Sequence, residues 1–503
     1  MPHQFVITIP VADRPLQLRR CLQSLVTLCD NFPPQSAPQL LLADDSAPEG
    51  RAAIAAIAAE FNRPELIVEY FGPQQQLELL QQLQPNTAQQ LHSLLGTAVA
   101  IEAGHKGASL TRNLLYLRLW QLQATLLEPL FLFIDSDESF HADIDYFGHY
   151  ERLFTQTDSV VATGKVDGDP PVSPAVMARS LLTDLTAILT GMSQLSATDG
   201  CQFHTEATYH GDDGGYHDMA SLFGLTPKRF ERGDFHCRLQ GEHSHFEALL
   251  ALCQPLNHFF DGEHPTRITP RSRLAVDKSI QPARTVYTGN YIVNRQGLRH
   301  AIPFAALKLR MAGPTLGRLL KAELGHRFVT LNLPLHHHRT TAKLARAEFR
   351  PGIEHRSHHI DISGEFERQF WGDVMLFSVE ALSRLAPALR GLSGKTIESV
   401  VTSTQQQFEH HYQTNLTAIE QQSRALRQQL TQPHAWWHHA DHNAIVPLMA
   451  QFLDHIEYNF GDRSQNSALI SNASHSARLA ELIDAIERYP TEQLLWQQAL
   501  SEL

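Results

Sequence analysis

Two short acidic segments carry the residue types best suited to chemistry in this chain. Asp135–Asp137, an Asp-Ser-Asp motif, follows the apolar run 130–134, and the pair Asp44 and Asp45 follows the apolar run 40–43. Carboxylate oxygens are the ligands that hard divalent cations prefer, and such a cation can bind a diphosphate at the same time. Any Asp-x-Asp turn matches the motif, and Asp44 and Asp45 alone would fit a simple turn with a helix cap. Two acidic segments after separate apolar runs favour one shared ligand site.

Alternating strands and helices must position these carboxylates. The predicted strands are 5–9, 40–43, 66–70, 130–134 and 160–163. The predicted helices are one that Asp13 caps and that continues to 29, and those over 51–61, 74–90 and 110–120. This alternation predicts an α/β fold, a mostly parallel sheet with helices on both faces. Ligands of such sheets bind outside the carboxyl ends of the strands, where both acidic segments are expected.

The rest of the chain divides into three parts. Residues 195–285 are rich in His, Gly, Asp and Pro and predict an irregular insertion with one helix near 246–253. Regular structure resumes at 286, with a strand at 291–293, a helix at 315–324 and a strand at 328–333 that ends at Pro334. Helical spacing alone continues after 341. The expected domains are 1–341, with the insertion, and an all-helical region, 342–503.

Composition narrows the class of protein. The chain has 503 residues, 43% hydrophobic content and a net charge of −12, which argues against general nucleic-acid binding. Its five cysteines are an odd number and form no C-x-x-C pair, so a reducing compartment is expected. We find no secretory signal pattern and no stretch near the ~20 apolar residues of a membrane span. A cytoplasmic location is therefore expected.

Four segments in order resemble the family 2-like glycosyltransferases, nucleotide-diphospho-sugar transferases with the GT-A fold. They are 7–10 with Arg14, 43–46, 106–113 and 133–138. The resemblance covers 1–170 well and 285–341 less closely; it covers neither 195–285 nor the C-terminal third. It implies a GT-A-like domain over 1–341. It also implies a metal-dependent enzyme of hexosyltransferase type that moves a sugar from a nucleotide-diphosphate donor to a hydroxyl acceptor.

The resemblance also implies roles for individual residues. Asp45 would face the nucleobase with Asp44 beside it, and Arg112 would position the nucleotide. The residues implied along the nucleoside and behind the donor sugar are Pro10, Arg14, Gly289 and Asn290.

A metal site belongs to the same resemblance. Asp135 would approach the ribose and the metal, and Asp137 would ligate Mn²⁺ or Mg²⁺. In this fold a late histidine often completes the metal shell, and a His among 336–338 is expected to do so here, with His336 and His338 as the candidates. The cation would stabilise the charge that builds on the diphosphate as the glycosidic bond breaks.

One departure from the family concerns the catalytic base. Inverting members usually carry an acidic pair near the start of a late helix, but the corresponding stretch 310–318 contains no carboxylate. Another acid could act, the enzyme could retain configuration and need no such base, or the protein could be inactive. The candidate acids in the irregular region are Asp212 and Asp213, chosen first, with Asp218 and Glu242.

Two other functions stay open. One is a nucleotidyltransferase on the same fold, which 10–15 disfavours because it lacks a glycine-rich loop. The other is an inactive sugar-nucleotide-binding or scaffold protein that uses the helical region as its surface for a protein partner.

Residues 201–264 also contain many histidines and three cysteines, a composition that resembles that of a zinc site. Their spacings fit no standard zinc finger, so we expect a solvated loop instead.

Overall fold

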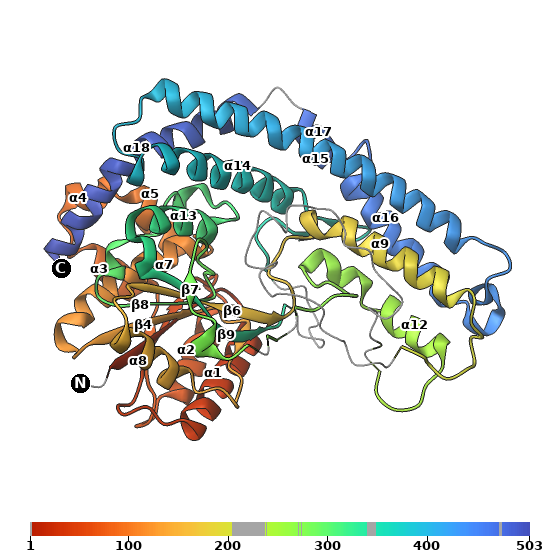
Figure 1. The fold of residues 1–503 in the computed structure, drawn as a ribbon, viewed down its shortest axis with the longest axis horizontal. Helices are drawn as coiled ribbons and strands as arrows, with labels where there is room; N and C mark the ends of the chain where they lie inside the picture. The colour runs from red at the N-terminus through yellow and green to blue at the C-terminus, as the bar shows by residue number, and fades with distance from the viewer. Residues whose placement is uncertain are drawn as a thin grey trace.

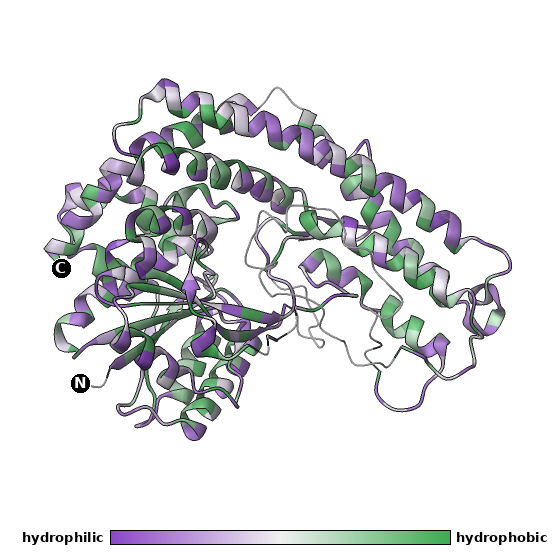
Figure 2. Ribbon diagram, in the orientation of Figure 1, coloured by the Kyte–Doolittle hydropathy of each residue, from purple (hydrophilic) through white to green (hydrophobic). Residues whose placement is uncertain are grey.

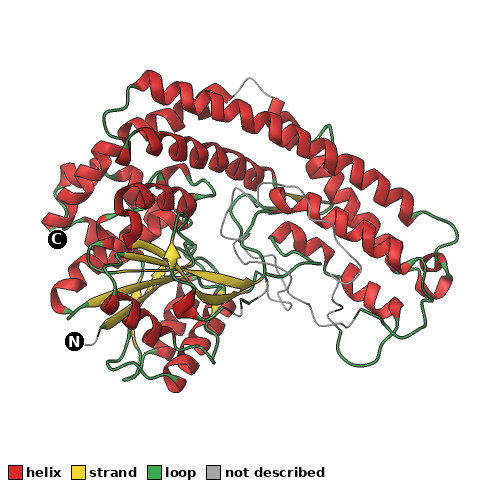
Figure 3. Ribbon diagram, viewed as in Figure 1, coloured by secondary structure: helices red, strands yellow, loops and turns green. Residues whose placement is uncertain are grey.

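The computed structural model describes residues 3–203, 237, 239–269, 271–272, 274–339, 349–471 and 475–503. It confirms an α/β fold with a central sheet of nine strands and a helical C-terminal region (Figures 1 and 3). The sheet order is β3-β2-β1-β4-β8-β6-β9-β5, with β7 also paired to β9. Six strands run in one direction, and β5, β7 and β8 run against them. The expected mostly parallel sheet is therefore present.

The strands arise from the apolar runs of the sequence. Their bounds are β1 Gln4–Val11, β2 Gln39–Asp44, β3 Ile67–Phe71, β4 Pro129–Ile134, β5 Glu138–Ser139, β6 Val161–Gly168, β7 Gln281–Pro282, β8 Asn290–Val293 and β9 Phe328–His337. Side chains alternate between the faces, so in β1 Val6 joins the core on one face and Ile7 the core on the other. Figure 2 shows how hydrophobic these strands are compared with the outer side of the long helices.

Helices cover both faces of the sheet. One face carries α1 Pro15–Asn31, α2 Arg51–Phe61 and α8 Tyr146–Gln156. The other carries α3 Pro73–Leu80, α4 Pro85–Gln90, α5 His92–Leu95, α6 Ala98–Ala103, α7 Ala108–Leu122 and α13 Ala312–Leu324. The order of the strands creates a switch point, because the chain adds β2 and β3 on one side of β1 and then adds β4 on its other side. Ligands of open α/β sheets bind at such a point.

A second lobe is helical. It contains α9 Pro174–Met192, α12 His245–Cys253, α14 Ser363–Leu385, α15 Gly394–Leu430, α16 Ile445–Phe460, α17 Gln465–Ser471 and most of α18 His475–Glu502. One continuous apolar core joins these helices, so α9 and α12 pack with helices from the far end of the sequence (Figure 1). The short pair β10 Glu354–His355 and β11 Ile360–Asp361 is the strand pairing that the structure describes within this lobe.

Several local expectations need correction. Asp13 does not cap α1, because Arg14 is the N-cap and makes no side-chain capping bond. The helix expected over 74–90 divides into α3 and α4, with Pro85 in the first turn of α4. β9 does not end at Pro334. It continues to His337, because the register of β6 against β9 shifts beside this proline and removes the need for its missing N–H.

Helix α9 was not anticipated, although Ser173 caps it and Pro174 occupies its first turn. It is the single helix in the described residues that is long and apolar enough to cross a membrane by length and composition. More than half of its apolar window is buried inside the protein, where α9 packs along α15. Its apolar character is thus accounted for by the core of the helical lobe.

Candidate functional site

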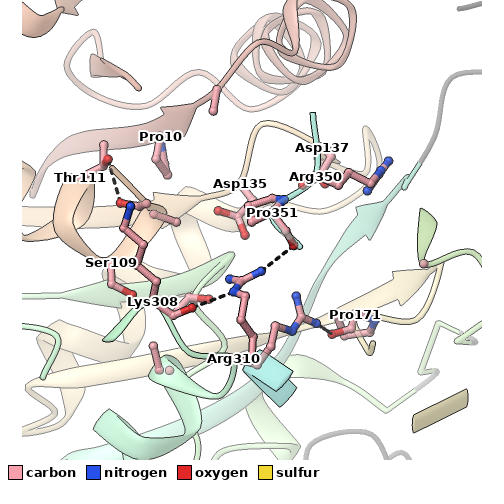
Figure 4. Close-up of a pocket in the computed structure, with 18 of the residues that line it drawn as sticks. Pro10, Ser109, Thr111, Asp135, Asp137, Pro171, Lys308, Arg310, Arg350 and Pro351 are labelled. Carbon is pink, nitrogen blue, oxygen red and sulfur yellow. Dashed lines mark hydrogen bonds between the residues drawn. The ribbon is translucent and has the colours of Figure 1, made fainter. Parts of the chain in front are cut away.

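A cavity of about 540 Å³ opens at the switch point of the sheet. The loops after β1 and β4 form one wall, with Pro10, Arg14 and the Asp135–Asp137 segment. The loop before β8, the start of α13 and the start of α14 form the opposite wall. Figure 4 shows Asp135 and Asp137 in the cavity together with Lys308 and Arg310, whose side chains donate to the backbone oxygens of His105 and Pro171. The cavity therefore lies between the sheet and the helical lobe and draws residues from both.

Both aspartates of the Asp-Ser-Asp motif reach this cavity. Asp135 is about one-third exposed and forms an ion pair with Arg112, which is buried. Asp137 is nearly buried and accepts a hydrogen bond from Nη1 of Arg14 at 2.8 Å. Burial alone would raise the pKa of Asp137, but His337, Arg14 and Arg339 together hold that pKa well below its usual range. Asp137 is thus a fixed negative charge at neutral pH.

The histidine beside Asp137 is His337. Its Nε2 lies 3.7 Å from Oδ2 of Asp137, and its Nδ1 bonds to the backbone oxygen of Asp169 at 2.7 Å. The structure does not bring the predicted ligands His336 and His338 to this place. Neither lines the cavity, because alternate residues of a strand face opposite sides, and their rings lie 4.1 Å apart on the other side of β9. His336 instead binds Asp167 at 2.6 Å.

The second acidic segment has mostly internal partners. Asp45 lines the cavity, but its carboxylate accepts bonds from Nζ and N of Lys106 at 2.9 and 3.0 Å and from N of Gly107 at 2.9 Å. Asp44 is fully buried and does not line the cavity; it accepts bonds from the backbone of Ser46 and the hydroxyl of Tyr70. The two acidic segments therefore converge on one cavity through Asp45 alone.

The remaining predicted nucleotide ligands divide in the same way. Pro10, Arg14 and Arg112 line the cavity. Asn290 does not, because its buried side chain donates to the backbone oxygens of Lys165 and Leu333, both at 2.7 Å. Gly289 does not line it either and packs against Glu138, where a Cβ would meet the carboxylate at 2.4 Å.

Sequence reasoning missed most of the basic side chains at this site. The basic residues along the cavity are Arg14, Arg112, Lys308, Arg310, Arg339, Arg350 and Arg368, and the acidic residues are Asp45, Asp135, Asp137, Asp261 and Glu365. The cavity thus carries a surplus of positive charge in a chain whose net charge is −12. The close spacing of Lys308 and Arg310 was a usable signal, but the others come from distant segments that only the fold unites.

A buried carboxyl lies directly behind the motif. Glu138 accepts a bond from the backbone N of Asp135 at 3.2 Å, and its Oε1 has no hydrogen-bond partner within the described residues. Burial, reinforced by the charges of Asp135 and Asp137, raises the pKa of Glu138 well above its usual value. Burial and the two neighbouring aspartates thus disfavour a further negative charge directly behind the motif.

The structure shows which carboxylates lie close enough to the cavity to act as a catalytic base. The stretch without carboxylates, 310–318, does border the cavity through its first residues. The predicted catalytic acids Asp212 and Asp213, and Asp218, lie outside the described residues, and Glu242 does not line the cavity. Two unpredicted acids do, and both are paired with cations. Asp261 contacts His355 at 2.9 Å and Arg350 at 3.7 Å. Glu365 contacts Arg368 at 3.0 Å and Arg310 at 3.4 Å.

Comparison with known proteins finds no match in sequence and a weak match in structure. No protein-family model matches the chain, and no curated protein matches it in sequence. Among solved structures, the chain is similar to the crystal structure of mouse xyloside xylosyltransferase 1 in its apo form. The identity is 11%, the TM-score is 0.25, and the match covers 65% of this chain and 78% of that chain. A TM-score this low carries no argument, so the function has to be inferred from the geometry of the cavity.

Proposed function

We propose that this protein is a metal-dependent glycosyltransferase that moves a sugar from a nucleotide-diphosphate donor to a hydroxyl acceptor. One observation carries the proposal. At the switch point of an α/β sheet, two carboxylates one residue apart, Asp135 and Asp137, share a cavity with a surplus of arginine and lysine. That combination suits a diphosphate with its divalent cation, and the position is where such sheets bind nucleotides.

The basic side chains supply the chemistry of the leaving group. When the glycosidic bond of a sugar nucleotide breaks, negative charge develops on the β-phosphate. Positioned guanidinium groups stabilise such charge, and they do so more strongly in a site shielded from water. Arg339 lines the cavity close enough to Asp137 to lower the pKa of that carboxyl, and Arg310 and Lys308 line the cavity from a single segment. In this proposal they bind the diphosphate and hold it as it departs.

The types of side chain present suit a divalent cation, although the ligand atoms of Asp135, Asp137 and His337 would have to move closer together to share one, because they do not all lie within 4.8 Å of one another. Asp135 and Asp137 offer carboxylate oxygens to the cavity, Asp137 stays ionised, and His337 offers an imidazole nitrogen beside it. Two carboxylates with an imidazole suit Mn²⁺, and Mg²⁺ is favoured if all ligands are oxygen. When bound, the cation would neutralise the diphosphate as a Lewis acid. Arg14 and Arg112 fix the directions in which the two carboxylates point.

A second candidate is a sugar-nucleotide-binding protein without transfer activity. The observation that favours it concerns the base: within the described residues, every carboxylate that lines the cavity bonds to a lysine, arginine or histidine. None is left as an evident base for an acceptor hydroxyl. A transferase that retains the configuration of the sugar needs no such base, so this observation alone does not decide between the two.

The test is donor hydrolysis and transfer with Mn²⁺ across a panel of sugar nucleotides, with Asp137→Asn as the key variant. We expect Asp137→Asn to lose at least about a hundred-fold in activity, since even outer partners of a metal ligand are worth 10- to 100-fold. Asp143→Asn is the matched control, because Asp143 is two-thirds exposed and pairs with Arg271 away from the cavity. Full activity of Asp137→Asn would count decisively against the assignment.

Calorimetry separates the alternatives. Binding of a nucleoside diphosphate with Mn²⁺ but no turnover of any donor supports the binding protein. Release of pyrophosphate from a nucleoside triphosphate would instead support a nucleotidyltransferase. No binding at all removes both leading candidates.

A further inference from the structure

Two cysteines and a histidine meet at the edge of the helical lobe, away from the cavity. The ligand atoms of Cys201, Cys237 and His243 all lie within 4.8 Å of one another. Sγ of Cys237 and Nε2 of His243 are 3.1 Å apart. Cys237 and His243 are only 6 positions apart, but Cys201 precedes Cys237 by 36 positions, so the fold brings Cys201 to the other two.

Backbone hydrogen bonds hold the three residues in this arrangement. The N–H of Cys201 donates to the backbone oxygen of His243 at 2.8 Å, and the N–H of Cys237 donates to that of Phe203 at 3.0 Å. Gly200 and Ser244 form an antiparallel bridge immediately beside them. Cys201 and Cys237 also pack against the apolar core of the helical lobe. The segments that carry the side chains are therefore fixed before any ligand binds.

The imidazole has an arrangement typical of metal ligands. Nδ1 of His243 lies 2.9 Å from the backbone oxygen of Gly241, a bond in which the ring nitrogen donates its proton. The lone pair is then on Nε2, the nitrogen that faces the sulfur of Cys237. Histidines that bind metals commonly use their second nitrogen in this way, which fixes the tautomer and the ring.

We propose that Cys201, Cys237 and His243 bind a Zn²⁺ ion. Sulfur and imidazole nitrogen are the donors that zinc prefers, at about 2.3 and 2.0–2.1 Å, so tetrahedral coordination separates S and N by about 3.6 Å. The observed 3.1 Å needs to open by only a few tenths of an ångström. Binding takes both cysteines as thiolates and releases their two protons to solvent. A water molecule can take the fourth position.

The position of the site explains what the ion would do. Cys201 and Cys237 stand on either side of residues 204–236, and His243 directly precedes the capping box of α12, formed by Ser244 and Glu247. A zinc ion there would tie Cys201 and Cys237 to each other and to the start of α12. Such an ion contributes folding free energy directly, because the site does not exist in the unfolded chain.

The test is the metal content of the full chain, purified without chelators and measured by inductively coupled plasma mass spectrometry. We expect about one zinc per chain, and less than about a tenth of that in Cys201→Ser, Cys237→Ser and His243→Gln. Cys253→Ala, in nearby α12, and the exposed His439→Gln are matched controls that keep the zinc. Asp137→Asn also keeps it, so failure of this site and failure of the proposed donor site are distinguishable.

A second measurement covers the case in which the variants fold poorly. Co²⁺ added to the metal-free wild-type chain should give the visible absorption bands of a tetrahedral ion and a near-ultraviolet charge-transfer band from thiolate to cobalt. Added Zn²⁺ should displace the Co²⁺ and abolish both sets of bands. Three results would overturn the proposal. They are zinc content that the three variants leave unchanged, a metal-free chain without these bands, and a disulfide between Cys201 and Cys237 in peptides from the freshly purified protein.

Discussion

Individual ion pairs explain how an acidic chain can present a site for an anion. Arg14 and Arg112 are committed to Asp137 and Asp135, so each carboxylate of the motif carries its own cation. The positive surplus comes from the other basic side chains along the cavity. Among them Arg339, which follows β9 and lies near Asp137, makes no ion pair within the described residues, and its Nε has no hydrogen-bond partner there. Local compensation of this kind allows phosphate binding without a basic surface.

Asp373, a buried residue of α14, gives the fold a specific dependence on pH. Burial raises the pKa of this carboxyl to about 8, although Tyr412 donates to it at 2.6 Å and Gln369 at 2.8 Å. Between about pH 4 and pH 8 the unfolded chain has lost this proton while the folded chain keeps it. Folding must then take up a proton, so this residue lowers stability as pH rises, by at most about 1.4 kcal/mol per pH unit. Below pH 4 it costs nothing.

The prediction is that Asp373→Asn flattens this dependence. Its free energy of unfolding, measured in urea from pH 5 to pH 8.5, should gain on the wild type as pH rises and level off above pH 8. Asp484→Asn is the control, because Asp484 is exposed in α18 and should follow the wild-type curve. Parallel curves for Asp373→Asn and the wild type would contradict the raised pKa.

Single residues also show how far the site could be predicted. The sequence was sufficient to place Asp135, Asp137 and Asp45 at strand ends that meet. It did not show that Asp44 turns towards Tyr70 or that Lys106 lies against Asp45, since these partners come from other elements. The choice among the three histidines depends on the parity of a strand, and a proline at 334 concealed where that strand ends.

At the scale of elements, close approach of α13 to the loop before β8 shapes one wall of the cavity. Gly317 makes this possible, because a Cβ there would lie 2.6 Å from the Cα of Thr285 and from the N of Val286. Backbone atoms cannot yield as a flexible side chain can. The residues at 285–288 line the cavity, so displacement of α13 would reach the ligand site directly.

We expect Gly317→Ala to destabilise the protein by about 1–3 kcal/mol, as overpacking does, and to weaken nucleotide binding. Gly191→Ala is the matched control. It replaces a glycine inside α9 that has nothing within 4 Å, so the better helix propensity of alanine should stabilise the protein by up to about 1 kcal/mol. Urea denaturation and calorimetry measure both effects. Equal stability and equal nucleotide binding of the two variants would show that α13 can accommodate a methyl group at position 317.

The elements were predictable where their signals were local. Residues 51–61 form the expected helix, and the helix expected over 246–253 exists as α12. What the sequence concealed was tertiary. α9 and α12 belong to the region around the irregular insertion, yet their apolar faces are buried by α15 and α16, from the far end of the chain. No periodicity within a segment identifies its partner.

At the scale of the whole molecule, the C-terminal helix joins the two lobes. The middle of α18 packs in the helical core through Leu482 and Ile486, and its end packs in the core of the sheet lobe through Trp496 and Leu500 (Figure 1). Nε1 of Trp496 donates to the backbone oxygen of Leu298 at 3.4 Å. The predicted helical domain, 342–503, therefore supplies part of the core beneath the sheet.

This packing predicts that Trp496→Ala weakens the sheet lobe, some 150 residues beyond the expected domain boundary. Truncating a buried tryptophan costs about 3–5 kcal/mol, and here Trp496 belongs to the core of the sheet lobe, where α18 contacts α4 and the turn at 297–299. Leu494→Ala, two residues away on the same helix and 64% exposed, should change stability by less than about 0.5 kcal/mol. Hydrogen exchange measured along the chain distinguishes the two views of α18. Faster exchange at 85–119 in Trp496→Ala shows that the helix closes the sheet lobe, whereas faster exchange confined to 475–503 would show that the lobes fold independently.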